Sequence, residues 1–201
     1  MKLLLATHNE HKRREFERLL AGRFEIETLP EGVELPPEDG DTFAENALGK
    51  ARAAARATGR VSIADDSGIC AATLGGAPGV RSARYAGEHA SDAENLHKLL
   101  REVPAGGALE YVCAIAYVDP TSATQQLFEG RCAGTLAAQP GGEGGFGYDP
   151  AFLPVDDPLG GEGPTKRTMA QLSDAQKDAI SHRGRAARAL LEWLDAGGGA
   201  G

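Results

Sequence analysis

The stretch Ala64-Asp65-Asp66-Ser67-Gly68 decides how the rest of this chain is interpreted. It follows Val61-Ser62-Ile63, a short run that predicts a buried strand, so we expect both aspartates where that strand ends. In an open α/β sheet, ligands collect at the carboxyl ends of the strands. Two neighbouring carboxylates repel one another unless a cation or hydrogen-bond donors offset them, which suits a hard metal such as Mg²⁺. The alternative is a plain polar turn, because Asp, Ser and Gly are common turn residues.

The composition narrows the class of protein. A chain of 201 residues can bury a sizeable core as one domain or as two close-packed lobes. Its formal charge of −8 argues against nucleic acid or an anionic membrane as the main partner. The three cysteines include no C-x-x-C pair, which suits a reducing compartment and gives no zinc signature. Since no apolar run has the length of a signal-peptide core or a membrane span, we expect a cytoplasmic protein.

The N-terminal residues predict a strand, a turn and a helix. Lys2–Ala6 is the expected strand and Glu10–Leu20 the expected helix, with Asn9 as its N-cap. This order of elements places backbone N–H groups where they can hold a phosphate, and Lys12 adds a positive charge one turn later. An ordinary capped helix with a solvated Lys12 explains the same pattern.

The next segment combines clustered acids with a capping box. After an expected strand at Phe24–Leu29, Thr42-x-x-Glu45 opens a helix that we expect to reach Ala57. The acids beside its start complement the helix dipole or bind a metal, and both interpretations stay open. Lys50 is interpreted as part of a solvated helix face.

The second half of the chain continues the alternation of helices and strands. We expect one helix from the capping box Ser91-x-x-Glu94 to about Val103, and paired strands at Leu109–Val118 and Gln125–Leu136. The expected remaining segments are a loop at Val155–Arg167, a broken helix at Thr168–Ile180 with Ser173 as a cap, a last helix at Arg185–Leu194 and a disordered tail at Ala196–Gly201.

The glycine-rich segment Pro140–Pro150 stands out from these elements. It contains five glycines, which allow the backbone to approach a ligand closely, together with Phe146 and Tyr148, which can stack on a flat ring. A flexible linker is the alternative, but linkers seldom hold aromatic residues at this density.

Several segments together resemble one enzyme family, the inosine/xanthosine triphosphate pyrophosphatases, in order and spacing over nearly the whole chain. The segments are Ala6-Thr7-His8-Asn9 with Lys12, Thr42-Phe43-x-Glu45-Asn46-Ala47 with Lys50, Ala64-Asp65-Asp66-Ser67-Gly68, Gly145-Phe146-Gly147-Tyr148-Asp149-Pro150, and Ser181-His182-Arg183.

The resemblance implies a fold and an activity. The fold is α/β, an elongated mixed sheet with flanking helices in two lobes around a central substrate cleft, within a single catalytic domain at residues 1–195. The activity is Mg²⁺-dependent hydrolysis of ITP, dITP and XTP to the monophosphate and pyrophosphate, which cleanses the nucleotide pool. The implied partners are a purine nucleoside triphosphate and a second copy of the chain in a homodimer, with neither nucleic acid nor membrane.

The resemblance also assigns roles to residues. Asp66 is the implied base for water, and Glu38 and Asp66 are the implied metal ligands. The implied substrate-binding residues are Thr7, His8, Asn9, Glu10, His11, Lys12 and Ser67 for the phosphates, and Phe146, Gly147, Tyr148, Asp149, Lys177, His182 and Arg183 for the purine. Two other functions stay open: pyrophosphatase activity on a different modified nucleotide, and nucleotide binding by a regulator without turnover.

Overall fold

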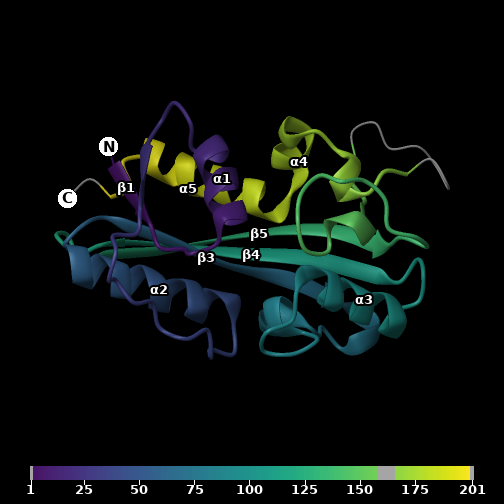
Figure 1. The fold of residues 1–201 in the computed structure, drawn as a ribbon. Helices are drawn as coiled ribbons and strands as arrows, with labels where there is room; N and C mark the ends of the chain where they lie inside the picture. Colours follow the sequence, from purple (N-terminus) through teal and green to yellow (C-terminus); the bar gives the residue numbers. More distant parts are fainter. Residues whose placement is uncertain (1, 158–165, 200–201) are drawn as a thin grey trace. The chain divides into compact units, whose positions relative to one another are not determined.

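The structure is a computed structural model, and it describes residues 2–157 and 166–199. Strands and helices alternate from the N-terminus (Figure 1). The strands are β1 (Lys2–Leu5), β2 (Glu25–Thr28), β3 (Ser62–Ala71), β4 (Ala108–Asp119), β5 (Thr124–Leu136) and β6 (Phe152–Pro154). The α-helices are α1 (Glu10–Leu19), α2 (Phe43–Thr58), α3 (Asp92–Glu102), α4 (Asp174–Ile180) and α5 (His182–Asp195). Short 3-10 helices are η1 (Ala72–Leu74), η2 (Gly79–Arg84), η3 (Asp149–Ala151) and η5 (Met169–Gln171).

The six strands form one sheet in the order β2-β1-β3-β4-β5-β6. β1 runs parallel to β2 and to β3, whereas β5 and β6 are antiparallel, so the sheet is mixed. The predicted α/β class, a mixed sheet with flanking helices, is therefore confirmed. The predicted lobes and central cleft stay a prediction. Within residues 2–157 and 166–199, no helix has the length and apolar character needed to cross a membrane.

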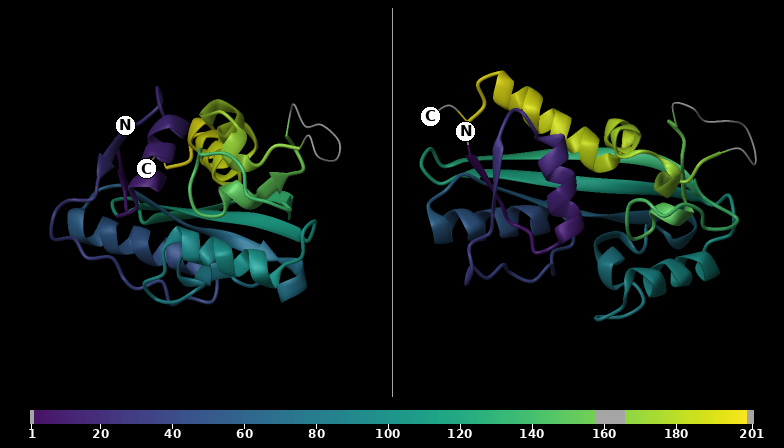
Figure 2. Two further views of the ribbon diagram at one scale, coloured as in Figure 1. Left: turned by 45° about the vertical axis from the view of Figure 1, so that its right-hand side comes forward. Right: turned by 45° about the horizontal axis from the view of Figure 1, so that its top comes forward.

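The described residues divide into two compact units. The first comprises residues 2–66, 113–130 and 183–199, and the second comprises residues 67–112, 131–157 and 166–182. In the first unit, α1 and α5 lie on one face of the sheet and α2 lies on the other (Figures 1 and 2). The alternation of β1 matches this arrangement, because Leu3 and Leu5 pack with Phe16 and Leu190, whereas Leu4 packs with the alanines of α2.

The second unit has its own core. α3 lies on one face of its part of the sheet and α4 on the other (Figure 1). Ile69 of β3, Leu99 of α3, Tyr111 of β4, Phe152 of β6 and Ile180 of α4 belong to one buried apolar cluster. Each unit therefore buries its own apolar side chains, which holds its polar residues in place.

The helix starts predicted from capping residues are confirmed. The side chain of Asn9 accepts hydrogen bonds from the N–H groups of His11 and Lys12 at the start of α1. Thr42, Ser91 and Ser173 cap α2, α3 and α4, each within a complete capping box.

One prediction about the strands is wrong. Asp65-Asp66-Ser67-Gly68 does not follow a strand but lies inside β3, which continues to Ala71. Aspartate and glycine are poor strand formers, and the side-chain contacts of Asp65 and Asp66, with the close packing at Gly68, override that preference here. The last helix also begins at His182, three residues earlier than expected, and β6 was not predicted.

Two predicted segments are described only in part. Of the loop at Val155–Arg167, residues 158–165 lie outside the described residues. At the C-terminus, residues 196–199 form turns, and the N–H groups of Ala196 and Gly198 donate to the carbonyls of Glu192 and Trp193. The predicted domain limit at residue 195 stays a prediction.

We expect that Gly68→Ala destabilises the fold. A Cβ at Gly68 would lie 2.3 Å from Ser82 Oγ and 2.5 Å from the Gly79 carbonyl oxygen. Ser82 cannot yield easily, because its Oγ accepts from Ile69 N at 2.9 Å and donates to Gly79 O at 2.6 Å. Overpacking of this kind costs about 1–3 kcal/mol, which urea unfolding would measure.

Gly49→Ala is the matched control for this prediction. Gly49 lies within α2, and its nearest neighbour for an added Cβ is Pro36 Cγ at 3.8 Å, an ordinary contact. Alanine is the better helix former, so this variant should keep or gain up to about 1 kcal/mol. Equal unfolding free energies for the two variants would contradict the packing around Gly68.

Candidate active site

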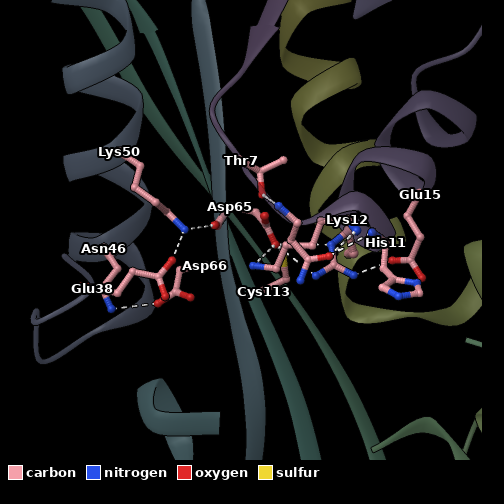
Figure 3. A network of polar contacts seen from close by, with 12 residues as sticks. Thr7, His11, Lys12, Glu15, Glu38, Asn46, Lys50, Asp65, Asp66 and Cys113 are labelled. Atoms are coloured by element: carbon pink, nitrogen blue, oxygen red, sulfur yellow. Dashed lines mark hydrogen bonds and ion pairs between the residues drawn. The ribbon is translucent and has the colours of Figure 1, made fainter. Parts of the chain in front are cut away.

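The candidate site of the first unit is built on two adjacent carboxylates of β3. Successive side chains of a strand point to opposite faces, so Asp65 faces α1 and α5 while Asp66 faces α2 (Figure 3). Both are buried, with Asp65 fully enclosed and Asp66 3% exposed. The sequence predicted both carboxylates at one turn, and the structure instead gives each its own set of neighbours.

Asp65 is surrounded by cations. Its Oδ2 lies 3.2 Å from Lys12 Nζ of α1 and 3.0 Å from Arg183 Nη2 of α5. Arg183 forms a second buried ion pair with Glu15, also on α1. The thiol of Cys113 on β4 lies 3.9 Å from the same carboxylate oxygen. These contacts tie β3 to both helices on that face of the sheet.

The charges of this network determine its protonation. Burial alone would raise the pKa of Asp65, but Lys12 and Arg183 outweigh it and lower the pKa below its usual range. Burial would lower the pKa of Arg183, and the opposing charges of Asp65 and Glu15 raise it instead. Burial raises the pKa of the Cys113 thiol, with a further rise from Asp65, so this cysteine is not a nucleophile.

Asp66 has a different environment on the opposite face of β3. Its Oδ2 accepts a hydrogen bond from Asn46 Nδ2 at 2.8 Å. Lys50, one helical turn later on α2, donates to the carbonyl oxygen of Asp65 at 2.6 Å and forms an ion pair with Glu38. Burial, followed by the negative charge of Glu38, raises the pKa of Asp66.

The donor set on this face fits a hard divalent cation. Glu38 lies close enough to Asp66 to disfavour the charge of Asp66, and the two carboxylates offer the oxygen ligands that Mg²⁺ prefers. In the described part of the chain, no group of three or more His, Cys, Asp or Glu residues could hold a metal. Mg²⁺ is usually bound by one or two carboxylates and completes its coordination with water and substrate phosphates.

The predicted phosphate site at the start of α1 is partly occupied by its own cap. Asn9 Oδ1 accepts from His11 N at 2.9 Å and from Lys12 N at 3.1 Å, and Thr7 Oγ1 accepts from Asn9 N at 3.2 Å. Glu10 pairs with Arg13 at 2.5 Å on the helix surface, and His8 is exposed. The side chain of Lys12, rather than these backbone N–H groups, is therefore the part of this segment that we expect to contact a phosphate.

The second unit holds a buried polar group around Asp149. Its Oδ2 accepts from Lys177 Nζ of α4 at 2.6 Å and from Phe146 N at 2.9 Å. Its Oδ1 accepts from the hydroxyl of Tyr111 at 3.1 Å. The Lys177 ammonium also lies 5.2 Å from the centre of the Phe146 ring, in cation–π range.

The neighbours of Asp149 are fixed by further contacts. The ring of His182 stacks on that of Tyr111, with centroids 4.5 Å apart and planes 9° from parallel. Gly147, at φ +62°, donates its N–H to Asp92 Oδ2 at 3.0 Å. Tyr148 is buried, and its hydroxyl donates to the Ser82 carbonyl at 2.7 Å, so these contacts favour a structural role over stacking on a ligand.

The structure groups the predicted residues differently from the sequence. Phe146, Asp149, Lys177 and His182 come together as predicted for a purine site. Arg183 forms ion pairs with Asp65 and Glu15 of the first unit, and its role at the purine stays a prediction. Ser67 follows Asp66 in β3 and is half-buried.

Sequence reasoning missed several polar residues of both groups. The interpretation of Lys50 as solvated is wrong, because it is only 5% exposed. The helical spacing contained a signal, since Asn46 and Lys50 share a face with the buried Ala47, Ala51 and Ala54. Glu15 and Tyr111 gave no comparable signal.

We expect opposite stability effects from the two neighbouring aspartates. Asp65→Asn leaves the buried charges of Lys12 and Arg183 short of a partner, and breaking a buried pair costs about 3–5 kcal/mol. Asp66→Asn removes a carboxylate whose charge is disfavoured by burial and by Glu38, so stability should hold or rise. Chemical unfolding of both variants is the measurement, and a loss from Asp66→Asn as large as that from Asp65→Asn would contradict this division.

Comparisons with known proteins agree with this fold, and the matches cover nearly the whole chain. The Ham1 family model matches residues 3–193. The dITP/XTP pyrophosphatase of Corynebacterium glutamicum (strain R) is 46% identical over 206 residues, covering 96% of this chain and 97% of the other. That of Mycobacterium tuberculosis (strain ATCC 25618 / H37Rv) is 45% identical over 205 residues, covering 96% and 95%.

Solved structures give the same result. A HAM1 protein from Coxiella burnetii superposes with a TM-score of 0.84 at 36% identity, covering 98% of this chain and 99% of the other. A nucleoside-triphosphatase / dITP/XTP pyrophosphatase from Mycobacterium abscessus gives a TM-score of 0.70 at 41% identity, covering 95% and 99%. From the extent of these matches, the chain belongs to the Ham1 family.

Proposed function

We propose that this chain hydrolyses the non-standard purine nucleoside triphosphates ITP, dITP and XTP to the monophosphate and pyrophosphate, with Mg²⁺ as cofactor. The observation that carries the proposal is the pair of adjacent buried carboxylates in β3: Asp65 meets Lys12 and Arg183, and Asp66 accepts a hydrogen bond from Asn46 and has its pKa raised by burial and by Glu38. The dITP/XTP pyrophosphatases at 45–46% identity support the substrate class.

Asp66 and Glu38 are the residues that we propose to hold the metal. Mg²⁺ bound there supplies charge neutralisation of the phosphate oxygens and a lower pKa for a nearby water. Asp66 is the residue that we propose as the base, since burial and Glu38 raise its pKa, whereas Lys12 and Arg183 lower that of Asp65. Removing a base of this kind commonly lowers the rate about 10²–10⁴-fold.

Two lysines are available for the phosphate charge. Lys12, on one face of β3, and Lys50, on the other, are both held by carboxylates before any substrate arrives. A cation that is already fixed near the reaction centre needs little reorganisation as charge builds up on the leaving pyrophosphate. We therefore assign both lysines to the triphosphate, with Thr7, Asn9, His11 and Ser67 beside them.

The buried group around Asp149 is the part that we propose to recognise the base. Hypoxanthine and xanthine present a carbonyl at C6, whereas adenine presents an amino group there. Lys177 carries three N–H donors, so it can hold Asp149 and also donate to such a carbonyl. Phe146, whose ring is half-buried beside Lys177, is suited to stacking on any purine.

Three further parts of the proposal come from the sequence and from the family resemblance. They are a homodimer in solution, a cytoplasmic location, and the absence of nucleic acid and membrane partners. Sedimentation equilibrium tests the first directly, since a monomer at micromolar concentration would contradict it.

We expect XTP to yield XMP and pyrophosphate as first products. The two lysines and the metal act on the triphosphate, and pyrophosphate is the leaving group that this charge stabilises best. Ion-exchange separation after a brief incubation with Mg²⁺ identifies the products, with Asp66→Asn as the inactive control. Detection of XDP and orthophosphate first would contradict the proposal, and tight XTP binding without turnover would indicate a regulator.

We expect Lys177→Met and Phe146→Ala to affect base selection differently. Lys177→Met removes the donor to the C6 carbonyl, so the XTP-to-ATP ratio of kcat/KM should fall by about tenfold or more. Phe146→Ala removes stacking that all purines share, so both values should fall while their ratio is nearly kept. The reverse pattern would assign selection to the aromatic ring.

A further inference from the structure

Asn46 connects the two predicted metal ligands without being one of them. It lies in the first turns of α2 and is 5% exposed. Its Nδ2 donates to Asp66 Oδ2 at 2.8 Å, and its Oδ1 accepts from the N–H of Gly40 at 2.8 Å. One side of the amide therefore holds the carboxylate of β3, and the other holds the loop that carries Glu38, two residues before Gly40 (Figure 3).

The backbone at Gly40 is pressed against this amide. A Cβ at Gly40 would lie 2.7 Å from Asn46 Oδ1 and 3.0 Å from Glu45 Cβ, closer than real side chains allow. The loop reaches its hydrogen bond with Asn46 only because residue 40 has no side chain. This close contact is independent of the bond to Asp66, and it indicates that the position of the loop is fixed from α2.

We propose that Asn46 is a positioning residue that sets the distance between Asp66 and the Glu38 loop for a divalent cation; the inference rests on the metal site of the proposed function. A side-chain amide can donate to a carboxylate through its nitrogen while it accepts from a backbone N–H through its oxygen. Aspartate accepts but cannot donate, and alanine does neither. Lys50, one turn later on the same helix face, holds the Glu38 carboxylate itself.

Asn95 is a control that the chain itself provides. It stands four residues after the N-cap Ser91 of α3, just as Asn46 stands four residues after Thr42. It is 2% exposed, donates to the Ala83 carbonyl at 3.0 Å and accepts from Ala86 N at 2.8 Å. Asn95 thus makes the same kind of bridge between a helix and a loop, but it contacts neither Asp66 nor Glu38.

The test measures metal binding apart from catalysis. Mn²⁺ alone is titrated into the full chain, and the free ion is followed by electron paramagnetic resonance for wild type, Asn46→Ala, Asn46→Asp and Asn95→Ala. Residues that orient metal ligands typically contribute 10–100-fold in affinity, so we expect Asn46→Ala to weaken Mn²⁺ binding by about that factor. Asn95→Ala should lower the melting temperature similarly and keep the wild-type affinity.

Other outcomes separate this inference from the proposed function. Wild-type affinity in a folded Asn46→Ala variant, or an equal loss in Asn95→Ala, would overturn it. If Asn46→Ala fails to fold, Gly40→Ala keeps the Asn46 side chain but forces the loop and the amide apart, and it should also weaken Mn²⁺ binding; unchanged binding there would overturn the inference as well. Mn²⁺ binding that depends on Asn46 in a chain that does not hydrolyse XTP would leave this inference standing and refute the proposed function.

Discussion

The fully buried charge of Asp65 is the constraint on which the first unit depends. A carboxylate taken out of water in the middle of a sheet is tolerated only if cations replace its hydration. Lys12 and Arg183 do so from α1 and α5, and Glu15 then offsets the second charge of the cluster. Because such networks contribute little net stability compared with apolar packing, their main effect here is geometric: they fix two helices of distant sequence against one strand.

The alternation of β3 gives two adjacent residues of the same type different properties. Asp65 points into the cluster of cations and its pKa is lowered, whereas Asp66 points toward α2, meets the amide of Asn46 and the charge of Glu38, and its pKa is raised. A carboxylate with a permanent charge suits a structural role. A neighbouring carboxylate whose charge is disfavoured in the absence of a cation suits metal binding. The alternation of side chains along β3 thus gives Asp65 an environment suited to a structural role and Asp66 an environment suited to a metal ligand.

Features set by local sequence were predictable, and features set by tertiary contacts were not. The capping side chains of Asn9, Thr42 and Ser91 accept hydrogen bonds from backbone N–H groups no more than three residues away. Their helix starts could therefore be derived from the sequence. The strand at Asp65 and Asp66 could not, since their neighbours come from elements far along the chain. The ion pairs of Arg183 could not be predicted for the same reason, while the grouping of Phe146 with Lys177 followed from the family resemblance.

Both units keep a buried lysine against a carboxylate: Lys50 pairs with the half-buried Glu38 in the first, and Lys177 pairs with the buried Asp149 in the second. Lysine has a flexible side chain that loses much rotamer freedom when it is fixed. A lysine that became ordered only on contact with its ligand would therefore reduce the affinity for that ligand. A carboxylate partner fixes the stem in advance. Burial would lower the pKa of Lys50, but the charges of Asp65 and Glu38 outweigh it and raise that pKa. If Glu38 holds the proposed metal, it cannot fully serve that metal while it also holds the ammonium, so the proposed site would couple metal binding to the position of Lys50 through one carboxylate.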